Sequence, residues 1–459
     1  MSKLYRDIIE SWSAEEGVNS NDELLAWING LNETTHVIVR ESSIKDDPFW
    51  FYDDKNGEVL NNKRGFFSIK GIRMFVDGEY IKEQPIINQP EIGYLGIICK
   101  KLDGVLHFLM QAKIEPGNVN CVQISPTIQA TKSNFTRVHG GKLPSYFDYF
   151  DNADKHRIIY DQVQSEQGTR FYKKRNRNII ILIDEDIEVL PNYMWMTLGQ
   201  LKHFLMIDNL VNMDTRTVLA GLPLLAEYSG DDSLEAQFRD KALYKSFFEI
   251  DPYKSLNRAM QKLNNYKMYR ETRTEFVPLN QLVDWKVSDE GITCRKDADF
   301  SVGYYDIEID GREVKHWTQP LFKANGIAEF GLLTTLGEDG VRRFLIKLDP
   351  EIGSFDSVEF GPTVRWEATR TMDGDNAIER IFRRYDEPEH RLVDVILSEE
   401  GGRFYHEQNR NVILDVPDAD KLKIPEDYIW VEMSTLWHMV NDYDVLNIQL
   451  RNLLTLINL

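Results

Sequence analysis

The segment SEQGTRFYKKRNRN at residues 165–178 recurs in the chain as SEEGGRFYHEQNRN at residues 398–411. The two copies start 233 residues apart (398 − 165), and nine of their fourteen positions are identical. They differ most in charge, since Lys173-Lys174-Arg175 in the first copy becomes His406-Glu407-Gln408 in the second. The repeat predicts a duplicated domain whose two copies have diverged.

Further matches extend the duplication along the chain. FFSIKGIRMFVDGE (66–79) matches DFSVGYYDIEIDGR (299–312), and ISPTIQATKSN (124–134) runs beside FGPTVRWEATR (360–370). We therefore expect a first repeat with N-terminal helices over 1–223, a helical connector over 224–254 and a divergent second repeat over 255–459.

Each repeat has the pattern of an α+β domain. Apolar, β-branched runs such as YLGIICK and VLHFLMQAKI predict strands, and the turn-like Leu102-Asp103-Gly104 separates them. A helix near 155–166, a strand through RNRNIIILID and closing helices in LGQLKHFLMID and LVNMDTRTVLAGL are expected to follow. This order predicts two tandem α+β domains, each with a mixed sheet flanked by helices.

Composition excludes several classes of protein. The formal charge of −20 argues against non-specific nucleic-acid or membrane-surface binding, which requires a basic face. No apolar run approaches the length of a membrane helix, and three cysteines without CxxC spacing fit a reducing compartment. These features predict a cytoplasmic protein.

Comparing the copies separates two kinds of polar residue. Residues kept in both are expected to serve the shared fold, through buried hydrogen bonds and helix caps, or a shared ligand site. The kept pairs are Ser165/Ser398, Glu166/Glu399, Tyr172/Tyr405, Asn176/Asn409, Arg177/Arg410, Asn178/Asn411, Asn212/Asn447 and Arg216/Arg451.

The unmatched polar residues lie mainly in the first copy. QATKSNFTRVHGGK (129–142) is rich in hydroxyl, amide and cationic groups, and its counterpart lacks the histidine and the paired glycines. Arg137, His139 and Gly140-Gly141 suit an anionic ligand, because glycines let backbone N–H groups approach oxygen atoms. The alternative is a solvated loop with an incidental histidine.

Familiar motifs are absent from the sequence. It contains no GxGxxG, no GxxxxGK[ST], no HExxH and no G-x-S-x-G. The segment SEEGG (398–402) resembles the end of a Nudix box, but Val395-Ile396 replaces the Arg-Glu pair that should precede it. A magnesium-dependent pyrophosphohydrolase is therefore disfavoured.

Several longer segments resemble the NDP-hexose 2,3-dehydratases of deoxysugar biosynthesis. They are QPEIGYLGI, FLMQAKIEPGNVN, SPTIQATKSNFTRVHGG, QSEQGTRFYKKRNRN and DNLVNMDTRTVL, and the similarity spans nearly the whole chain. Phe135 departs from the family, which has tyrosine there. The resemblance implies two Nudix-like domains, a homodimer, no metal or redox cofactor, and a lyase that converts dTDP-4-keto-6-deoxyglucose to a 3,4-diketo-2,6-dideoxy sugar. An NADPH-dependent ketoreductase is expected to consume that product.

This chemistry needs a base for the C3 proton, an oxyanion stabiliser, an acid for the C2 hydroxyl and a diphosphate clamp. The catalytic candidates in the first copy are His139, Glu115, Lys113 and Arg137, although Glu351 matches Glu115 in the second copy. Lys173 and Arg175 are expected to alternate along one strand face that suits a diphosphate. The remaining substrate-binding candidates are Gln111, Gln129, Asn134, Thr136, Tyr172 and Arg177.

We expect the second copy to keep the fold and a vestigial nucleotide pocket lined by Arg365, Trp366, Tyr405 and Arg410, although a tryptophan there is often part of the core. Two other functions stay open at this point. A non-catalytic binding protein for nucleotide sugars is one, and a degenerate Nudix hydrolase is the other.

Overall fold

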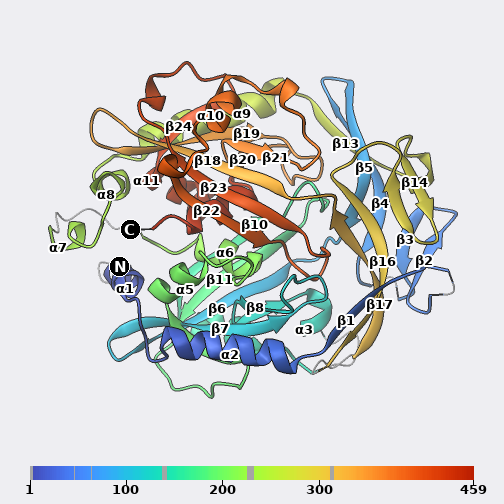
Figure 1. Ribbon diagram of the computed structural model, residues 1–459, viewed down its shortest axis with the longest axis horizontal. Helices are drawn as coiled ribbons and strands as arrows, with labels where there is room; N and C mark the ends of the chain where they lie inside the picture. Colours follow the sequence, from blue (N-terminus) through green and yellow to red (C-terminus); the bar gives the residue numbers. More distant parts are fainter. Residues whose placement is uncertain are drawn as a thin grey trace.

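The computed structural model describes residues 4–45, 47–63, 65–136, 142–224, 232–310 and 315–458. Each half contributes one mixed sheet of seven strands to this part of the chain, in the orders β10-β11-β6-β7-β12 and β22-β23-β18-β19-β24 (Figure 1). In the first sheet β8 pairs with β7 and β9 with β6, and in the second β20 pairs with β19 and β21 with β18. The matching orders confirm the predicted repeat and the α+β class.

The strands of these two sheets have the following bounds. They are β6 Gly93–Leu102, β7 Val105–Ile114, β8 Val122–Ser125, β9 Ile128–Ala130, β10 Arg157–Ser165, β11 Arg175–Leu182 and β12 Tyr193–Thr197, then β18 Ala328–Leu336, β19 Arg342–Asp349, β20 Glu359–Gly361, β21 Val364–Trp366, β22 Arg391–Ser398, β23 Gln408–Asp415 and β24 Tyr428–Glu432.

Helices cover both faces of each sheet. Strands β6 and β11 pair in parallel, as do β18 and β23, and both faces of such central strands are buried. Ile97 packs towards the layer of helices between the two sheets, whereas Ile98 packs with Phe150 on the opposite face (Figure 1). The helices are α1 Leu4–Ser13, α2 Asn21–Thr34, α3 Lys132–Phe135, α4 Phe147–Asp151, α5 Leu198–Phe204, α6 Met213–Leu219, α7 Asp232–Glu235, α8 Lys241–Phe248, α9 Tyr253–Tyr269, α10 Ala377–Tyr385, α11 Met433–His438 and α12 Ile448–Thr455.

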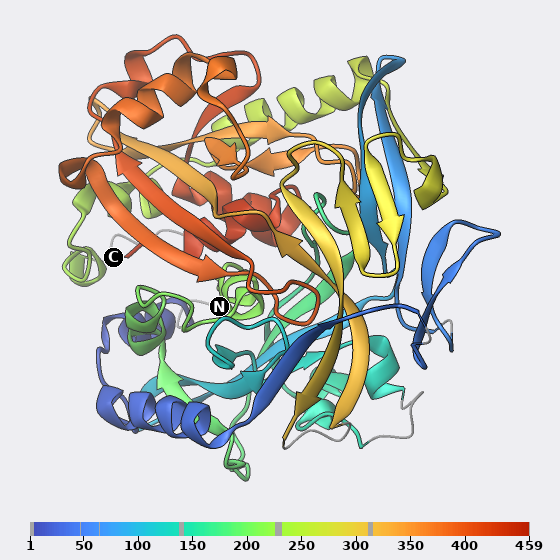
Figure 2. The same cartoon turned by 45° about the vertical axis from the view of Figure 1, so that its right-hand side comes forward.

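Two smaller sheets are built by reciprocal strand exchange between the halves. Strand β1 of the first half pairs with β16 of the second, and β13 of the second half pairs with β4 of the first (Figure 2). The other strands are β2 Trp50–Asp53, β3 Glu58–Asn61, β4 Ser68–Val76, β5 Glu79–Asn88, β14 Trp285–Ser288, β15 Gly291–Cys294, β16 Phe300–Ile309 and β17 His316–Ala324, with β1 at Val37–Ser42 and β13 at Thr272–Val277. Each half therefore needs a strand of the other to complete its sheet.

The repeated phrase forms two loops that cross between the halves. In the first, the Gly353 N–H donates to the Gly168 carbonyl at 2.7 Å, and in the second the Gly117 N–H donates to the Gly401 carbonyl at 2.7 Å. A Cβ at Gly117 would lie 1.6 Å from the Phe404 carbonyl oxygen, so only glycine allows this contact. Each copy of the repeated segment therefore contacts the opposite half.

Several pairs kept in both copies serve this shared structure. Asn212 caps α6 by accepting a 2.8 Å bond from the Thr215 N–H, and Asn447 caps α12 in the same way at 3.0 Å. The Arg216 guanidinium donates to the Ser398 carbonyl at 2.5 Å, while Arg451 donates to the Ser165 carbonyl. Buried hydrogen bonding and capping thus explain these four residues.

The predicted helix near 155–166 is wrong, because residues Arg157–Ser165 form strand β10. This strand pairs antiparallel with β11, from Arg157 opposite Leu182 to Ser165 opposite Arg175. The segment RIIYDQVQS contains β-branched residues, and cross-strand pairing outweighs its weak helical pattern. The other expected helices, at α5 and α6, are present.

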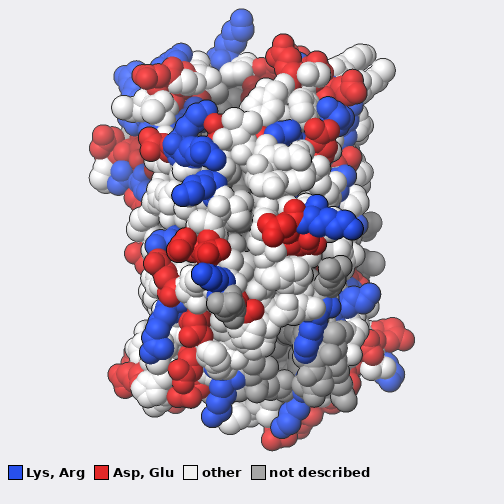
Figure 3. All heavy atoms as spheres, turned by 90° about the vertical axis from the view of Figure 1, so that its right-hand side faces the viewer, with Lys and Arg blue, Asp and Glu red and all other residues white. Residues whose placement is uncertain are grey.

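The surface formed by the two smaller sheets carries charges of both signs. Lysine and arginine are interspersed with aspartate and glutamate on this face, around an uncharged central stretch (Figure 3). Among the described residues, no helix is long and apolar enough to cross a membrane.

Candidate active site

A chain of hydrogen bonds joins the polar residues at the end of β7 to β9 and α6. Both the Lys113 Nζ and the Gln129 Nε2 donate to Glu115 Oε1 at 3.0 Å. The Asn212 amide donates to Gln129 Oε1 at 3.1 Å, which fixes the orientation of the glutamine. Glu115 is buried, whereas the Lys113 side chain is 17% exposed. The structure therefore brings three sequence-predicted residues, Lys113, Glu115 and Gln129, into one cluster, which we call the first cluster.

The second half contributes charged residues to the first cluster. Glu400 interacts with Glu115, Lys113 and Arg403, and burial together with the negative charge of Glu115 raises the pKa of Glu400 to about 7. Arg403 donates to Gln89 Oε1 at 3.2 Å and lies over the ring of Phe67. The first cluster is thus built from both halves.

Two further acids of the first half complete the first cluster. Burial raises the pKa of Asp214, on α6, well above its ordinary value, and the negative charge of Glu166 adds to the effect. Burial also raises the pKa of Glu166, against the opposing charge of Lys174. Burial thus favours the protonated form of both carboxyl groups, and groups with shifted pKa values of this kind are typical of sites of acid–base catalysis.

Glu91 connects the first cluster to the polar loop that begins at residue 129. The Lys174 ammonium donates to the Glu91 carbonyl, and the Gln89 amide donates to Glu91 Oε1 at 2.7 Å. The other carboxylate oxygen accepts the Ser133 N–H of α3 at 3.3 Å. Asn134 on this short helix and Thr136 directly after it are exposed, where a ligand entering from solvent would meet them.

Two catalytic candidates, Arg137 and His139, lie outside the described residues. Phe135 is described, and it stacks on Phe147 with ring centroids 5.4 Å apart. Gln111 lies on β7, opposite Tyr193 and Ser125 of the neighbouring strands and two residues before Lys113.

The aromatic candidates Tyr172 and Tyr405 lie where the two halves meet. Tyr172 packs with Ile352 of the second half and with Phe276, at 4.4 Å between ring centroids. Tyr405 stacks on Tyr305 of its own half, at 4.6 Å between ring centroids, and packs against the same buried cluster as Ile114, which lies between Lys113 and Glu115. Each crossing loop thus places its tyrosine against a cluster built from residues of both halves.

The expected alternation of Lys173 and Arg175 along a strand is wrong. Strand β11 starts at Arg175, and Lys173 has a φ of 49°, outside the strand region. The Lys173 N–H donates to the Gly353 carbonyl, and the Arg175 guanidinium lies 3.7 Å from the Phe355 ring centroid. Arg177 forms a bidentate ion pair with Asp161 at 2.7 and 2.6 Å. None of these contacts joins the three cations to the first cluster.

The equivalent group of the second half, which we call the second cluster, contains Asp349, Arg365, Glu399 and Glu407 and is occupied by its own ion pairs. Arg365, which replaces Gln129, makes a bidentate contact with Asp349 at 2.8 and 3.0 Å, and Asp349 replaces Lys113. Arg170 lies 3.5 Å from Glu407 beside a cavity of about 10 Å³, the space of about one water molecule.

The two other residues expected in the second pocket have structural contacts. Trp366 belongs to the core of the second half, and the Arg383 guanidinium lies 3.8 Å from its ring centroid. Arg410 forms ion pairs with Asp386, Asp394 and Glu329. The alternative interpretation of the tryptophan as a core residue therefore agrees with the structure.

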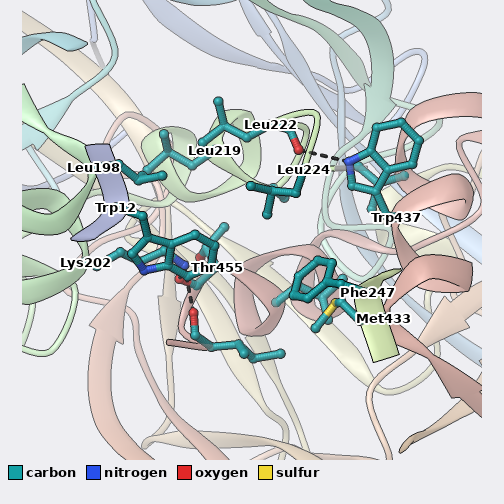
Figure 4. Close-up of a pocket in the computed structure, with 14 residues that line it drawn as sticks. Trp12, Leu198, Lys202, Leu219, Leu222, Leu224, Phe247, Met433, Trp437 and Thr455 are labelled. Carbon is teal, nitrogen blue, oxygen red and sulfur yellow. Dashed lines mark hydrogen bonds between the residues drawn. The ribbon is translucent and has the colours of Figure 1, made fainter. Parts of the chain in front are cut away.

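A separate apolar cavity of about 50 Å³ lies between the helices of the two halves (Figure 4). Its main polar group is Lys202, whose ammonium lies 4.1 Å from the Trp12 ring centroid and donates to the carbonyls of Thr455 and Ile457. The cavity is lined mainly by leucine, valine and aromatic side chains and lacks the carboxyl groups that distinguish the first cluster.

Lys202 predicts a pH-dependent stability. Burial lowers the pKa of Lys202 to about 7 in the folded protein. Because the unfolded lysine titrates near ~10.4, the unfolded chain binds more protons between these values, so stability rises with pH in this window. The difference in free energy of unfolding, wild type minus Lys202→Met, should therefore increase by about 1 kcal/mol for each pH unit within this window. Urea unfolding at several pH values in this window measures it, and a constant difference would refute it.

Comparisons with known proteins agree with the repeat. The model of a family described as NDP-hexose 2,3-dehydratase matches residues 21–222 and 257–457. A dTDP-4-dehydro-6-deoxy-alpha-D-glucopyranose 2,3-dehydratase of Saccharopolyspora spinosa is 37% identical, over 94% of this chain and 93% of the relative. Proteins of the same name from Streptomyces violaceoruber and Amycolatopsis orientalis are 36% and 32% identical, over 94% and 98% of this chain and 95% and 92% of their own lengths.

Proposed function

Because this chain belongs to the NDP-hexose 2,3-dehydratase family, we propose that it removes the C2 hydroxyl of dTDP-4-keto-6-deoxyglucose. The enzyme is a hydro-lyase that acts on a dTDP-sugar in deoxysugar biosynthesis. The observation that carries the proposed site is the first cluster, where Lys113 and Gln129 hold Glu115 beside acids whose pKa values are raised by burial.

The proposed reaction starts from the acidity of the C3 proton beside the C4 ketone. Glu115 takes this proton, and the electron pair of the C3–H bond moves towards C4, where an enolate oxygen develops. The Lys113 ammonium has three N–H donors, of which one contacts Glu115, so the others can stabilise this oxygen. The enolate then expels the C2 hydroxyl, which leaves as water once an acid has protonated it. The remaining enol takes a proton at C2 and becomes the 3,4-diketone.

We place this reaction in the first half, because the second half has lost the residues that it requires. Asp349 stands in place of Lys113 and would repel an enolate oxygen, and Arg365 is already bound by that aspartate. The sugar nucleotide is proposed to enter beside Asn134 and Thr136 and to contact Gln129 and Gln111. His139 and Arg137 remain candidates for the same site.

Lys113→Asp, which copies the second half into the first, tests this placement. We expect the rate of water loss from dTDP-4-keto-6-deoxyglucose to fall by about 10²–10³-fold, since a charge that stabilises the oxyanion becomes one that repels it. The matched control is Lys347→Gln, which gives the second half the residue that the first half has at Gln111. Mass spectrometry of the sugar nucleotide measures both rates, and equal rates in the two variants would contradict the placement.

We further propose that each half is Nudix-like, that the protein forms homodimers in the cytoplasm, and that an NADPH-dependent ketoreductase consumes the diketone. The mixed sheet with a central parallel pair supports the first point, and the free cysteines Cys99, Cys121 and Cys294 support a reducing compartment. Sedimentation analysis of the purified protein tests the dimer.

A further inference from the structure

Glu400 is an acid that the second half places in the first cluster. The loop that carries it is fixed by the Gly117 N–H, which donates to the Gly401 carbonyl, and by the Phe404 N–H, which donates to the Glu400 carbonyl at 3.1 Å. The loop position therefore depends on contacts with both halves. Glu400 is partly exposed, so a bound substrate can reach it.

The absence of a side chain at Gly402 lets Glu400 and Glu115 approach each other. A Cβ at Gly402 would lie 2.1 Å from Glu400 Oε1 and 3.4 Å from Glu115 Oε1. The first half has Thr169 at the equivalent position and Gln167 in place of Glu400. In the second cluster the equivalent residue is therefore an amide, Gln167, which donates to Glu399. Only the first cluster has a carboxyl group, that of Glu400, at this position.

From this geometry we infer that Glu400 is the acid that protonates the departing C2 hydroxyl, opposite the base Glu115. The inference rests on the proposed function of the first cluster. Glu115 Oε1 is held by an ammonium and an amide, which suit an ionised carboxylate, whereas the described part of the chain provides no such pair of donors for Glu400. Two neighbouring carboxyl groups in such different surroundings commonly divide the roles of base and acid.

The charges around Glu400 fit this role. They are Glu115, Arg403, Lys113, Glu166 and, on α6, Asp214. Burial and the charge of Glu115 raise the pKa of Glu400 to about 7, against the two cations. Glu400 is therefore protonated below about pH 7, and water elimination should decline as the pH rises above this value.

The variant Glu400→Gln tests whether protonation of the C2 hydroxyl can be lost while removal of the C3 proton continues. In deuterated water, the variant should still remove the C3 proton, so deuterium appears at C3 of the recovered substrate. Water elimination should fall by about 10²-fold or more, and its decline above neutral pH should disappear. NMR of the recovered sugar nucleotide reports the exchange, and mass spectrometry reports the elimination.

Two other variants complete the test. In Gly402→Ala the added methyl group would displace the Glu400 carboxyl, so this variant should also keep the exchange at C3 and lose water elimination. It replaces Glu400→Gln in the test if that variant does not fold. Glu407→Gln removes a buried acid from the second cluster and should keep elimination within about threefold of wild type.

Two outcomes for Glu400→Gln would overturn the role of Glu400. One is elimination within about threefold of wild type, and the other is joint loss of exchange and elimination in a folded protein. Wild-type protein that releases no water would instead contradict the proposed function, and the role of Glu400 would fall with it.

Discussion

Replacing Glu115 by glutamine is expected to lower kcat for water elimination by about 10²–10⁴-fold. Glutamine has nearly the same shape and keeps an oxygen for the Lys113 and Gln129 donors, but it cannot take a proton from C3. Exchange of the C3 proton with deuterated water should disappear together with elimination. This joint loss distinguishes the base from the acid Glu400, whose removal should spare the exchange.

The matched control for Glu115→Gln is Glu351→Gln, at the equivalent position of the second half. Glu351 accepts the Gly168 N–H at 3.1 Å and lies 3.8 Å from Arg365, so it holds a crossing loop. We expect this variant to lose stability but to keep kcat within about threefold of wild type. Equal losses of kcat in the two variants would refute a single catalytic half.

Arg451→Met is expected to lower the free energy of unfolding by about 3–5 kcal/mol. The Arg451 side chain is fully buried and donates to the carbonyls of Ser165 and Leu446, to the Ser165 hydroxyl at 3.3 Å and to the Thr217 hydroxyl at 3.2 Å. It also lies near Glu359, and burial raises the pKa of that acid to about 8. Methionine would fill the space and leave these groups without their donor.

Arg216→Met provides the comparison, since Arg216 is the equivalent residue of the first half. Its guanidinium donates to the Ser398 carbonyl and, at 3.4 Å, to the Asn212 carbonyl. With fewer contacts, Arg216→Met should destabilise the protein less than Arg451→Met does. Urea unfolding of both variants measures the difference. An Arg451→Met protein as stable as wild type would show that this contact does not hold the halves together.

The duplication could be read from the sequence because a repeat of fourteen residues with charged and aromatic positions does not arise from composition alone. It correctly predicted the α+β class and the closing helices α5 and α6. Lys113, Glu115 and Gln129 were also among the candidates named from the sequence, and the structure joins them by hydrogen bonds, while their catalytic and binding roles stay predictions.

The composite nature of the first cluster could not be predicted in this way. Comparing two copies at a fixed offset assumes that each residue acts within its own half, whereas a crossing loop brings Glu400 of the second half beside Glu115 and Lys113 of the first. The exchange of strands between the halves could not be predicted either. The sequence patterns of β1 and β13 indicate strands but do not show which half each strand pairs with. The sequence does show that the second copy has Glu400 where the first copy has Gln167. This acid was not considered as a catalytic candidate, because catalysis was expected only in the first copy.

The most direct test of the account is incubation of the wild-type protein with dTDP-4-keto-6-deoxyglucose in deuterated water, with chemical reduction of the unstable product before analysis. We expect the sugar to lose one water and to carry deuterium at C2, because the enol formed by elimination takes its proton from solvent. Mass spectrometry and NMR detect these changes. A recovered sugar that is intact and unlabelled at C2 and C3 would contradict the account.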